Sequence, residues 1–120
     1  MKLLFYKWIN TSPDIFTKCG SEFLACILFH LLGSLSPTPW CNAIVLMNLV
    51  FFTAKLSGGH LNPVITFVFF SLGYTNPVEL LLYWISQIGG CMIGALFLKI
   101  IVPSSLHLTG CFYPDRKSVV

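Results

Sequence analysis

Apolar residues fill this chain in four blocks, and polar or helix-breaking residues separate the blocks. The three longer blocks cover residues 21–35, 40–56 and 77–102, and a shorter block covers residues 62–72. The longer blocks approach the ~20 apolar residues of a membrane-spanning helix, the first by borrowing flanking residues. The short block makes ~15 Å of helix, half of the ~30 Å hydrocarbon core of a bilayer. The pattern predicts an all-α membrane protein with three transmembrane helices and one re-entrant half-helix.

Glycine and proline mark the ends of these blocks. The pair Gly58-Gly59 ends the second block, and Pro77 stands at the first helical position of the last one. Exposed backbone amides cost several kcal/mol each in lipid, so broken helix at membrane depth must face water or protein. Residues 56–62 therefore predict a water-filled lumen or a covering partner. The alternative is an ordinary loop at the membrane surface, with residues 62–72 as a buried interfacial helix.

Composition supports the membrane assignment. Of the 120 residues, 56% are hydrophobic and only 9% are charged, too few to cover a soluble domain. The net charge is +3, and the basic residues form no stripe with aromatic residues, so we expect no nucleic-acid partner. No two of the four acidic residues form a carboxylate pair suited to acid–base catalysis. No Ser or Cys stands at motif spacing with His and an acid, so we expect no enzyme and no cofactor.

The five cysteines show no spacing typical of a metal site. Cys26, Cys41 and Cys91 lie in apolar runs, where a cysteine acts as a small apolar filler. The sequence thus predicts no bound metal.

The two ends of the chain differ from the apolar blocks. Residues 1–18 alternate apolar residues with lysines before Pro13, which predicts an N-terminal segment lying in the membrane interface. Residues 103–120 are loop-like and include a polar run, which predicts a tail. One structural unit is expected between them, at residues 19–102.

The octet Ser-Gly-Gly-His-Leu-Asn-Pro-Val, at residues 57–64, stands where the chain breaks before the short block. Asn62 is a good N-cap, and Pro63 needs no amide hydrogen at the first helical position. The half-helix then begins at membrane depth and directs its positive dipole end toward the midplane. The octet resembles the first signature box of the aquaporin (major intrinsic protein) family, with Val64 where the family has Ala.

Two further stretches carry the same resemblance. Glu-Phe-Leu at residues 22–24 is similar to the family's first helix, and Tyr-Trp-Ile-Ser-Gln at residues 83–87 is similar to its third. Together the matches cover the first half of the family's fold, from residue 19 to residue 102. The residues of the octet and of the third-helix motif are most similar to those of the family branch that passes ammonia and hydrogen peroxide besides water.

The resemblance implies roles for the octet. Asn62 would offer its amide to a passing water at the tip of the half-helix. Gly58, Gly59 and His60 would present backbone carbonyls as a ladder of water acceptors. Simple helix capping and turn chemistry are the alternatives for these residues.

Two polar residues within the helices are expected to be structural. By resemblance, Glu22 would brace the re-entrant loop through its backbone amides, and Gln87 would be a similar buried brace. A carboxylate within a span is expensive and should have partners. A surface position at the helix end is the alternative for Glu22.

Helix periodicity suggests one pore-wall residue, the family resemblance implies a second, and the sequence contains one packing motif. Phe29 lies seven residues after Glu22, on nearly the same face, so it lines the lumen if Glu22 points inward. Asn42 falls at the family's outer constriction, where a small polar side chain would widen the passage. Gly90 and Gly94 form a GxxxG motif, which we expect to pack within the chain rather than between copies.

Three functions fit these features. The first is an aquaporin-like channel half that passes water or small neutral solutes after pairing with a second half, from another copy or another chain. The second is a truncated, non-conducting relative with a structural or assembly role in a membrane. The third, half of another broken-helix transporter, is disfavoured because no charged residue stands at the re-entrant tip. The expected partners are the lipid bilayer, a second channel half and further copies in an oligomer.

Overall fold

The computed structural model describes residues 13–36 and 38–102, and all regular structure within these ranges is helical. The helices are α2 (Ile15–Ser34), α3 (Pro39–Thr53), α4 (Pro63–Ser71) and α5 (Pro77–Ile101). Among the described residues, α2 and α5 have the length and hydropathy of membrane spans, and α3 is a shorter apolar helix. The all-α class predicted from the sequence is therefore confirmed.

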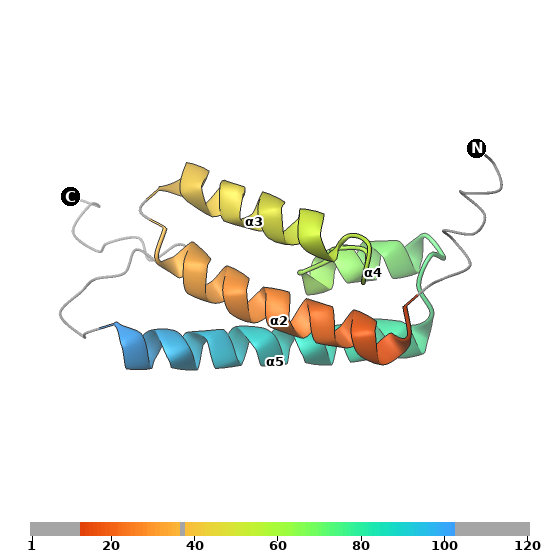
Figure 1. Ribbon diagram of the computed structural model, residues 1–120. Helices are drawn as coiled ribbons and strands as arrows, with labels where there is room; N and C mark the ends of the chain where they lie inside the picture. The colour runs from red at the N-terminus through yellow and green to blue at the C-terminus, as the bar shows by residue number, and fades with distance from the viewer. Residues whose placement is uncertain (1–12, 37, 103–120) are drawn as a thin grey trace, which may run out of the picture.

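The helices pack around α2. Helix α2 contacts α5 along its length and α3 on another side, and α4 packs against α5. Figure 1 shows α2 and α5 running side by side in the same direction, with α3 antiparallel to α2. Helix α4 covers only the end of the bundle where α2 and α5 begin (Figure 1). The chain between α3 and α4 consequently lies part-way along the bundle rather than at its end.

Capping residues explain where three helices begin. The side chains of Thr38, Asn62 and Asn76 each accept a hydrogen bond from a backbone N–H in the first turn of the helix that follows. A proline follows each cap, at a position where a helix loses nothing by lacking an amide hydrogen. Helix α4 therefore starts by the same local chemistry as its neighbours.

Two helix ends differ from the predicted blocks. Helix α2 begins at Ile15 rather than near residue 21, because extended backbone at Asp14 lets its carbonyl accept from the Lys18 N–H. Residues 15–18 therefore belong to α2, and residues 1–12, which make up most of the predicted interfacial segment, lie outside the described part of the chain. Helix α3 ends at Thr53 rather than residue 56, because the Thr53 carbonyl accepts from both Leu56 N and Ser57 N in a tight turn.

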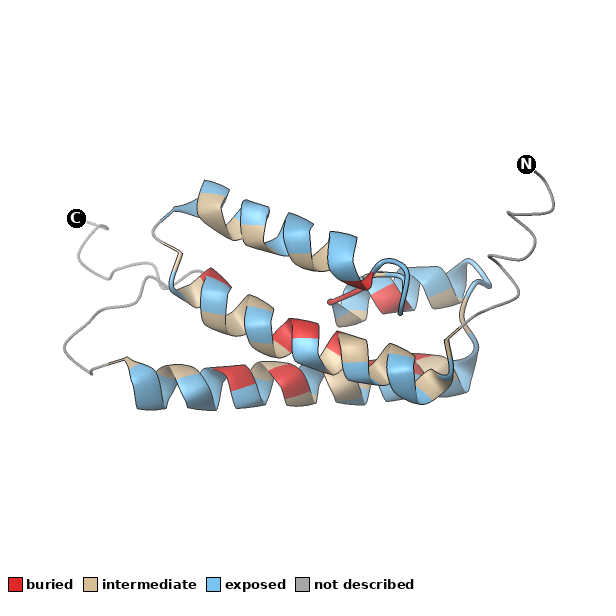
Figure 2. Cartoon of the chain, viewed as in Figure 1, coloured by how far each residue is buried: buried red, intermediate tan, exposed pale blue. Residues whose placement is uncertain are grey.

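The interior is small and partly polar. Ala25, Cys26 and Leu61 form its apolar cluster, and Leu49, Val50 and Cys91 pack against them. Figure 2 shows buried residues on the facing sides of α2 and α5, while the outer helix faces are exposed. Those outer faces carry many large apolar side chains, including Phe51, Ile85 and Ile100. Such surfaces are suited to lipid or another protein chain rather than to water.

The close approach of α2 and α5 depends on two glycines. A Cβ placed on Gly90 would collide with the carbonyl oxygen of Phe23, and one on Gly94 would lie 2.9 Å from the Cβ of His30. Any side chain at either position would push the helices apart. The Cβ of His30 on α2 therefore lies against α5.

Candidate functional site

The segment between α3 and α4 has a backbone that few residues adopt. Gly58, Gly59 and Leu61 have φ angles of 94°, 66° and 48°, all in the left-handed region. A Cβ on Gly59 would also lie 3.0 Å from the carbonyl oxygen of Val50, so glycine fits for two reasons. Leu61 is strained there by roughly 1–2 kcal/mol, so its surroundings must hold it in place.

The carboxylate of Glu22 holds this segment. Its Oε1 accepts from the Ser57 hydroxyl and from the His60 N–H at 3.0 Å. Its Oε2 accepts from the Leu61 N–H at 2.7 Å and from Gln87 Nε2 at 2.8 Å. Four donors match the lone pairs of an ionised carboxylate, which offers no hydrogen of its own. Glu22 is fully buried, so these bonds replace its hydration.

Leu61 is held at both of its backbone groups. Besides the bond to Glu22, its carbonyl oxygen accepts from the Cys26 thiol at 3.6 Å. Cys26 is completely buried, as a small filler should be, and it also contributes a weak donor to the loop. Cys41 and Cys91 are only half-buried.

The hydroxyl of Thr66, in α4, links the loop to this helix. Thr66 is not among the site residues predicted from the sequence. Its hydroxyl donates to the carbonyl of Asn62 and accepts from Gln87 Nε2 at 2.9 Å. Nδ1 of His60 lies 3.1 Å from the same hydroxyl oxygen, and the imidazole stacks on Phe69. One feature of the sequence could have indicated this role: Thr66 is a hydroxyl residue one helical turn after Asn62, inside an otherwise apolar block.

Two aromatic residues of α5 contact the site through their polar atoms. The Tyr83 hydroxyl donates to the carbonyl of Ser57 at 2.7 Å, and Trp84 Nε1 donates to the carbonyl of Pro63 at 2.9 Å. The Ser57 carbonyl lies in the turn after α3, and the Pro63 carbonyl lies in the first turn of α4. In the sequence these two aromatic residues belong to the third-helix motif, which by itself predicts no contact for them.

Asn62 stands at the exposed tip of α4. Its side-chain oxygen accepts from the Val64 N–H at 2.9 Å, which leaves the amide N–H groups at the tip. Asn62 and Val64 are exposed, as is Gly58, whereas His60 is buried. Only part of the predicted box is therefore exposed around the start of α4.

Phe29 and Asn42 lie away from the octet, Phe29 in the second half of α2 and Asn42 in the first turn of α3. Both are half-buried and both approach Gly33, with Asn42 Oδ1 2.6 Å from the position of a Cβ on that glycine. Gly33 thus makes room for the Asn42 side chain between α2 and α3. The pore-wall roles of Phe29 and Asn42 stay predictions.

Comparison with known proteins identifies the family. The family model for major intrinsic proteins matches residues 9–119. This chain belongs to the major intrinsic protein family. Relatives are the probable aquaporin TIP1-2 of Oryza sativa subsp. japonica (31% identity, covering 73% of this chain and 42% of that protein) and aquaporin-8 of Rattus norvegicus (29%, covering 71% and 36%). Aquaporin TIP1-1 of Arabidopsis thaliana is 32% identical over 74% of this chain and 43% of its own length.

Family membership decides several broader questions. This major intrinsic protein is an integral, multi-pass membrane protein of a channel family rather than an enzyme family. The chain spans less than half of the length of the curated relatives it matches. Within the described residues, no group of three or more His, Cys, Asp or Glu side chains has the arrangement of a metal site.

Proposed function

We propose that this chain forms one half of an aquaporin-like channel, which conducts water or small neutral solutes passively once paired with a second half. The observation that carries the proposal is the Glu22 carboxylate bound to the Ser57 hydroxyl and to the backbone N–H groups of His60 and Leu61, immediately before an exposed Asn62. Burying a carboxylate costs solvation free energy, and a loop at the protein surface does not need a buried carboxylate with four donors. Such a carboxylate suits a loop that must keep a fixed shape inside the membrane.

The helix lengths support three spans and one re-entrant half-helix within residues 19–102. Helix α5 has 25 residues, or ~38 Å, and exceeds the ~30 Å hydrocarbon core. Helix α4 has nine residues, or ~14 Å, and reaches only about half-way. Helix α3 has 15 residues, or ~22 Å, and the turns at residues 54–57 continue it toward the midplane.

The proposed pore chemistry uses the tip of α4. Asn62 donates to a passing water, while the carbonyls of residues 58–60 accept hydrogen bonds along the approach. The positive end of the α4 dipole disfavours cations at the same point. Glu22 and Gln87 brace the loop from behind, Phe29 and Asn42 border the passage, and Gly90 and Gly94 keep α2 and α5 in contact.

A second half is required because α4 is covered on one side only. It packs against α5, and Val64, Phe67 and Val68 of its outer face are exposed. An apposed half-helix, from an inverted second copy or another chain, would cover the tip and close a lumen. We expect ammonia and hydrogen peroxide among the solutes, because the octet and the third-helix motif are most similar to the branch that passes them. Small polar Asn42 would also widen the constriction.

A permeability assay on proteoliposomes tests the proposal. The substitution Asn62→Ser keeps an oxygen for capping and removes the amide donor, so osmotic water flux should fall several-fold. Asn76→Ser makes the same change at the cap of α5, away from the loop, and should leave the flux unchanged. Equal flux from empty vesicles and vesicles with the parent chain would reject conduction and favour the structural or assembly role.

A further inference from the structure

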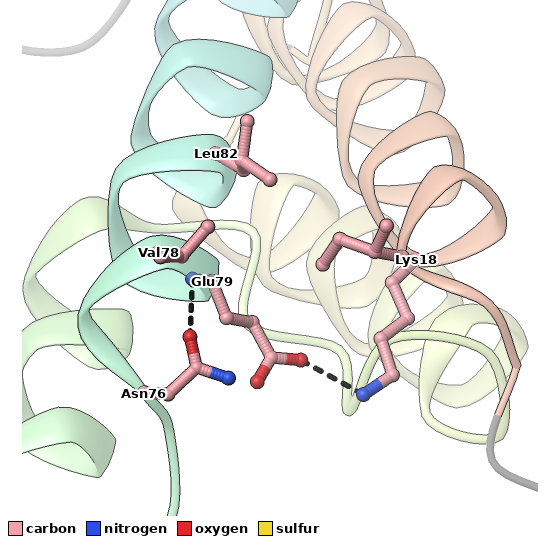
Figure 3. Close-up of a pocket in the computed structure, with 6 residues that line it drawn as sticks. Lys18, Asn76, Val78, Glu79 and Leu82 are labelled. Atoms are coloured by element: carbon pink, nitrogen blue, oxygen red, sulfur yellow. Dashed lines mark hydrogen bonds and ion pairs between the residues drawn. The ribbon is translucent and has the colours of Figure 1, made fainter.

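A groove lies between the first turns of α2 and α5, apart from the proposed pore. It has a volume of about 500 Å³ and is lined by Ile15, Lys18, Asn76, Val78, Glu79 and Leu82. Figure 3 shows Lys18 and Glu79 reaching toward each other across it, with Val78 and Leu82 along the α5 side. The Lys18 Nζ and Glu79 Oε1 atoms are 2.8 Å apart. The groove therefore combines an ion pair with an apolar wall.

The Lys18–Glu79 ion pair still has hydrogen-bonding groups available to a ligand. The recorded bond uses one of the three ammonium hydrogens of Lys18 and one of the two carboxylate oxygens of Glu79. The side chains are 25% and 13% exposed, so both are accessible and only partly hydrated. Asn76 fixes the backbone beside them by accepting from the Glu79 N–H at 2.8 Å. The two charges are thus presented in a defined geometry.

The position of the groove along α5 corresponds to the headgroup layer. Lys99 lies 20 residues after Glu79 in the same helix, a rise of ~30 Å that equals the thickness of the hydrocarbon core. The residues between them include no other Asp, Glu, Lys or Arg. Glu79 and Lys99 therefore mark the two boundaries of the apolar core, and the groove opens at one of them.

We propose that this groove binds the headgroup of a phosphatidylethanolamine lipid. Lys18 contacts the phosphate, Glu79 accepts from the primary ammonium, and Ile15, Val78 and Leu82 contact the upper acyl chains. The zwitterionic headgroup matches the paired charges of the groove. An anionic headgroup would be repelled by Glu79, and a choline headgroup has no N–H to donate to its carboxylate.

Native mass spectrometry of the full chain in detergent tests this proposal. Dioleoyl phosphatidylethanolamine and dioleoyl phosphatidylcholine, which share acyl chains, are added in equal amounts. The parent chain should retain the ethanolamine lipid up to roughly fivefold better, which is the upper end of what one partly exposed charged contact contributes. Glu79→Gln should abolish that preference, and Lys18→Gln should weaken both lipids. Lys99→Gln, which removes a charge at the far end of α5, should change neither.

A third variant keeps the test decisive if loss of either charge destabilises the helix pair. Leu82→Phe fills the groove while retaining the ion pair, and it should lower retention of the ethanolamine lipid. Equal retention of the two lipids by the parent chain would overturn the proposal, and so would an undiminished preference in a folded Glu79→Gln or Leu82→Phe protein. Occupation of the groove by the chain's own N-terminal segment would produce the first of these results.

Discussion

The carboxylate of Glu22 and the backbone N–H of Leu61 are joined by a 2.7 Å hydrogen bond across 39 positions of sequence. Leu61 has a left-handed φ, and Glu22 is fully buried in α2. The bond therefore joins a strained backbone position in the loop to a buried carboxylate on α2. Each stabilises the other, because a strained amide is held and a buried charge is solvated.

Removing the Glu22 carboxylate should destabilise the loop in a graded way. In Glu22→Gln, one oxygen becomes an NH₂ group that opposes two donors, at a cost of roughly 1–3 kcal/mol. Glu22→Ala leaves all four donors without this partner and should cost more. Thermal unfolding in detergent measures both variants. If both variants were as stable as the parent chain, Glu22 would have no bracing role.

Adding a methyl group at Gly90 should separate α2 from α5. The new Cβ would collide with the Phe23 carbonyl, and overpacking of this kind costs roughly 1–3 kcal/mol. Gly20→Ala is the matched control, because a Cβ there meets nothing within 4 Å and alanine favours helix. Unfolding in a denaturing detergent should therefore shift in opposite directions. A Gly90→Ala protein as stable as the parent chain would contradict the observed packing.

The hydroxyl of Tyr83 should stabilise the loop by a single hydrogen bond. Tyr83→Phe leaves the buried carbonyl of Ser57 without that donor, so we expect a loss of roughly 1–3 kcal/mol. Tyr74→Phe removes the same group from a side chain that is 76% exposed and should have almost no effect. The comparison is again made by thermal unfolding in detergent. Equal stability of the two variants would show that the Ser57 carbonyl finds another donor.

The source of the second half can be tested through topology. Asn10-Thr11-Ser12 is a glycosylation sequon, outside the described residues, and Pro13 after it is expected to lower its efficiency. Asn10→Gln removes it, so an efficient sequon on a flexible N-terminal extension becomes the only reporter. In a secretory expression system, an inverted self-pair requires part of the protein to be modified. Permeable liposomes from a protein that is never modified would instead indicate a separate second half.

Local patterns in the sequence were sufficient for the helices and for the family. Block lengths, caps and prolines act between neighbouring residues, so Asn62-Pro63 predicted the start of α4 closely. The octet and the third-helix motif identified the family for the same reason, since each is a short continuous run. The early start of α2 was missed because Gly20 and the polar residues around it look like an interruption, although they lie within a continuous helix.

Tertiary structure decided which residues share the site. Glu22, Thr66 and Gln87 come from three helices, and only their packing brings four donors to one carboxylate and two bonds to one hydroxyl. Tyr83 and Trp84 acquire their contacts in the same way, with carbonyls of Ser57 and Pro63 that lie more than 20 residues earlier. A hydrogen bond acts over about 3 Å, whereas a sequence pattern records only neighbours along the chain. The sequence alone determined the helical class and the start of α4, and the packing of α2 against α5 determined what holds the loop.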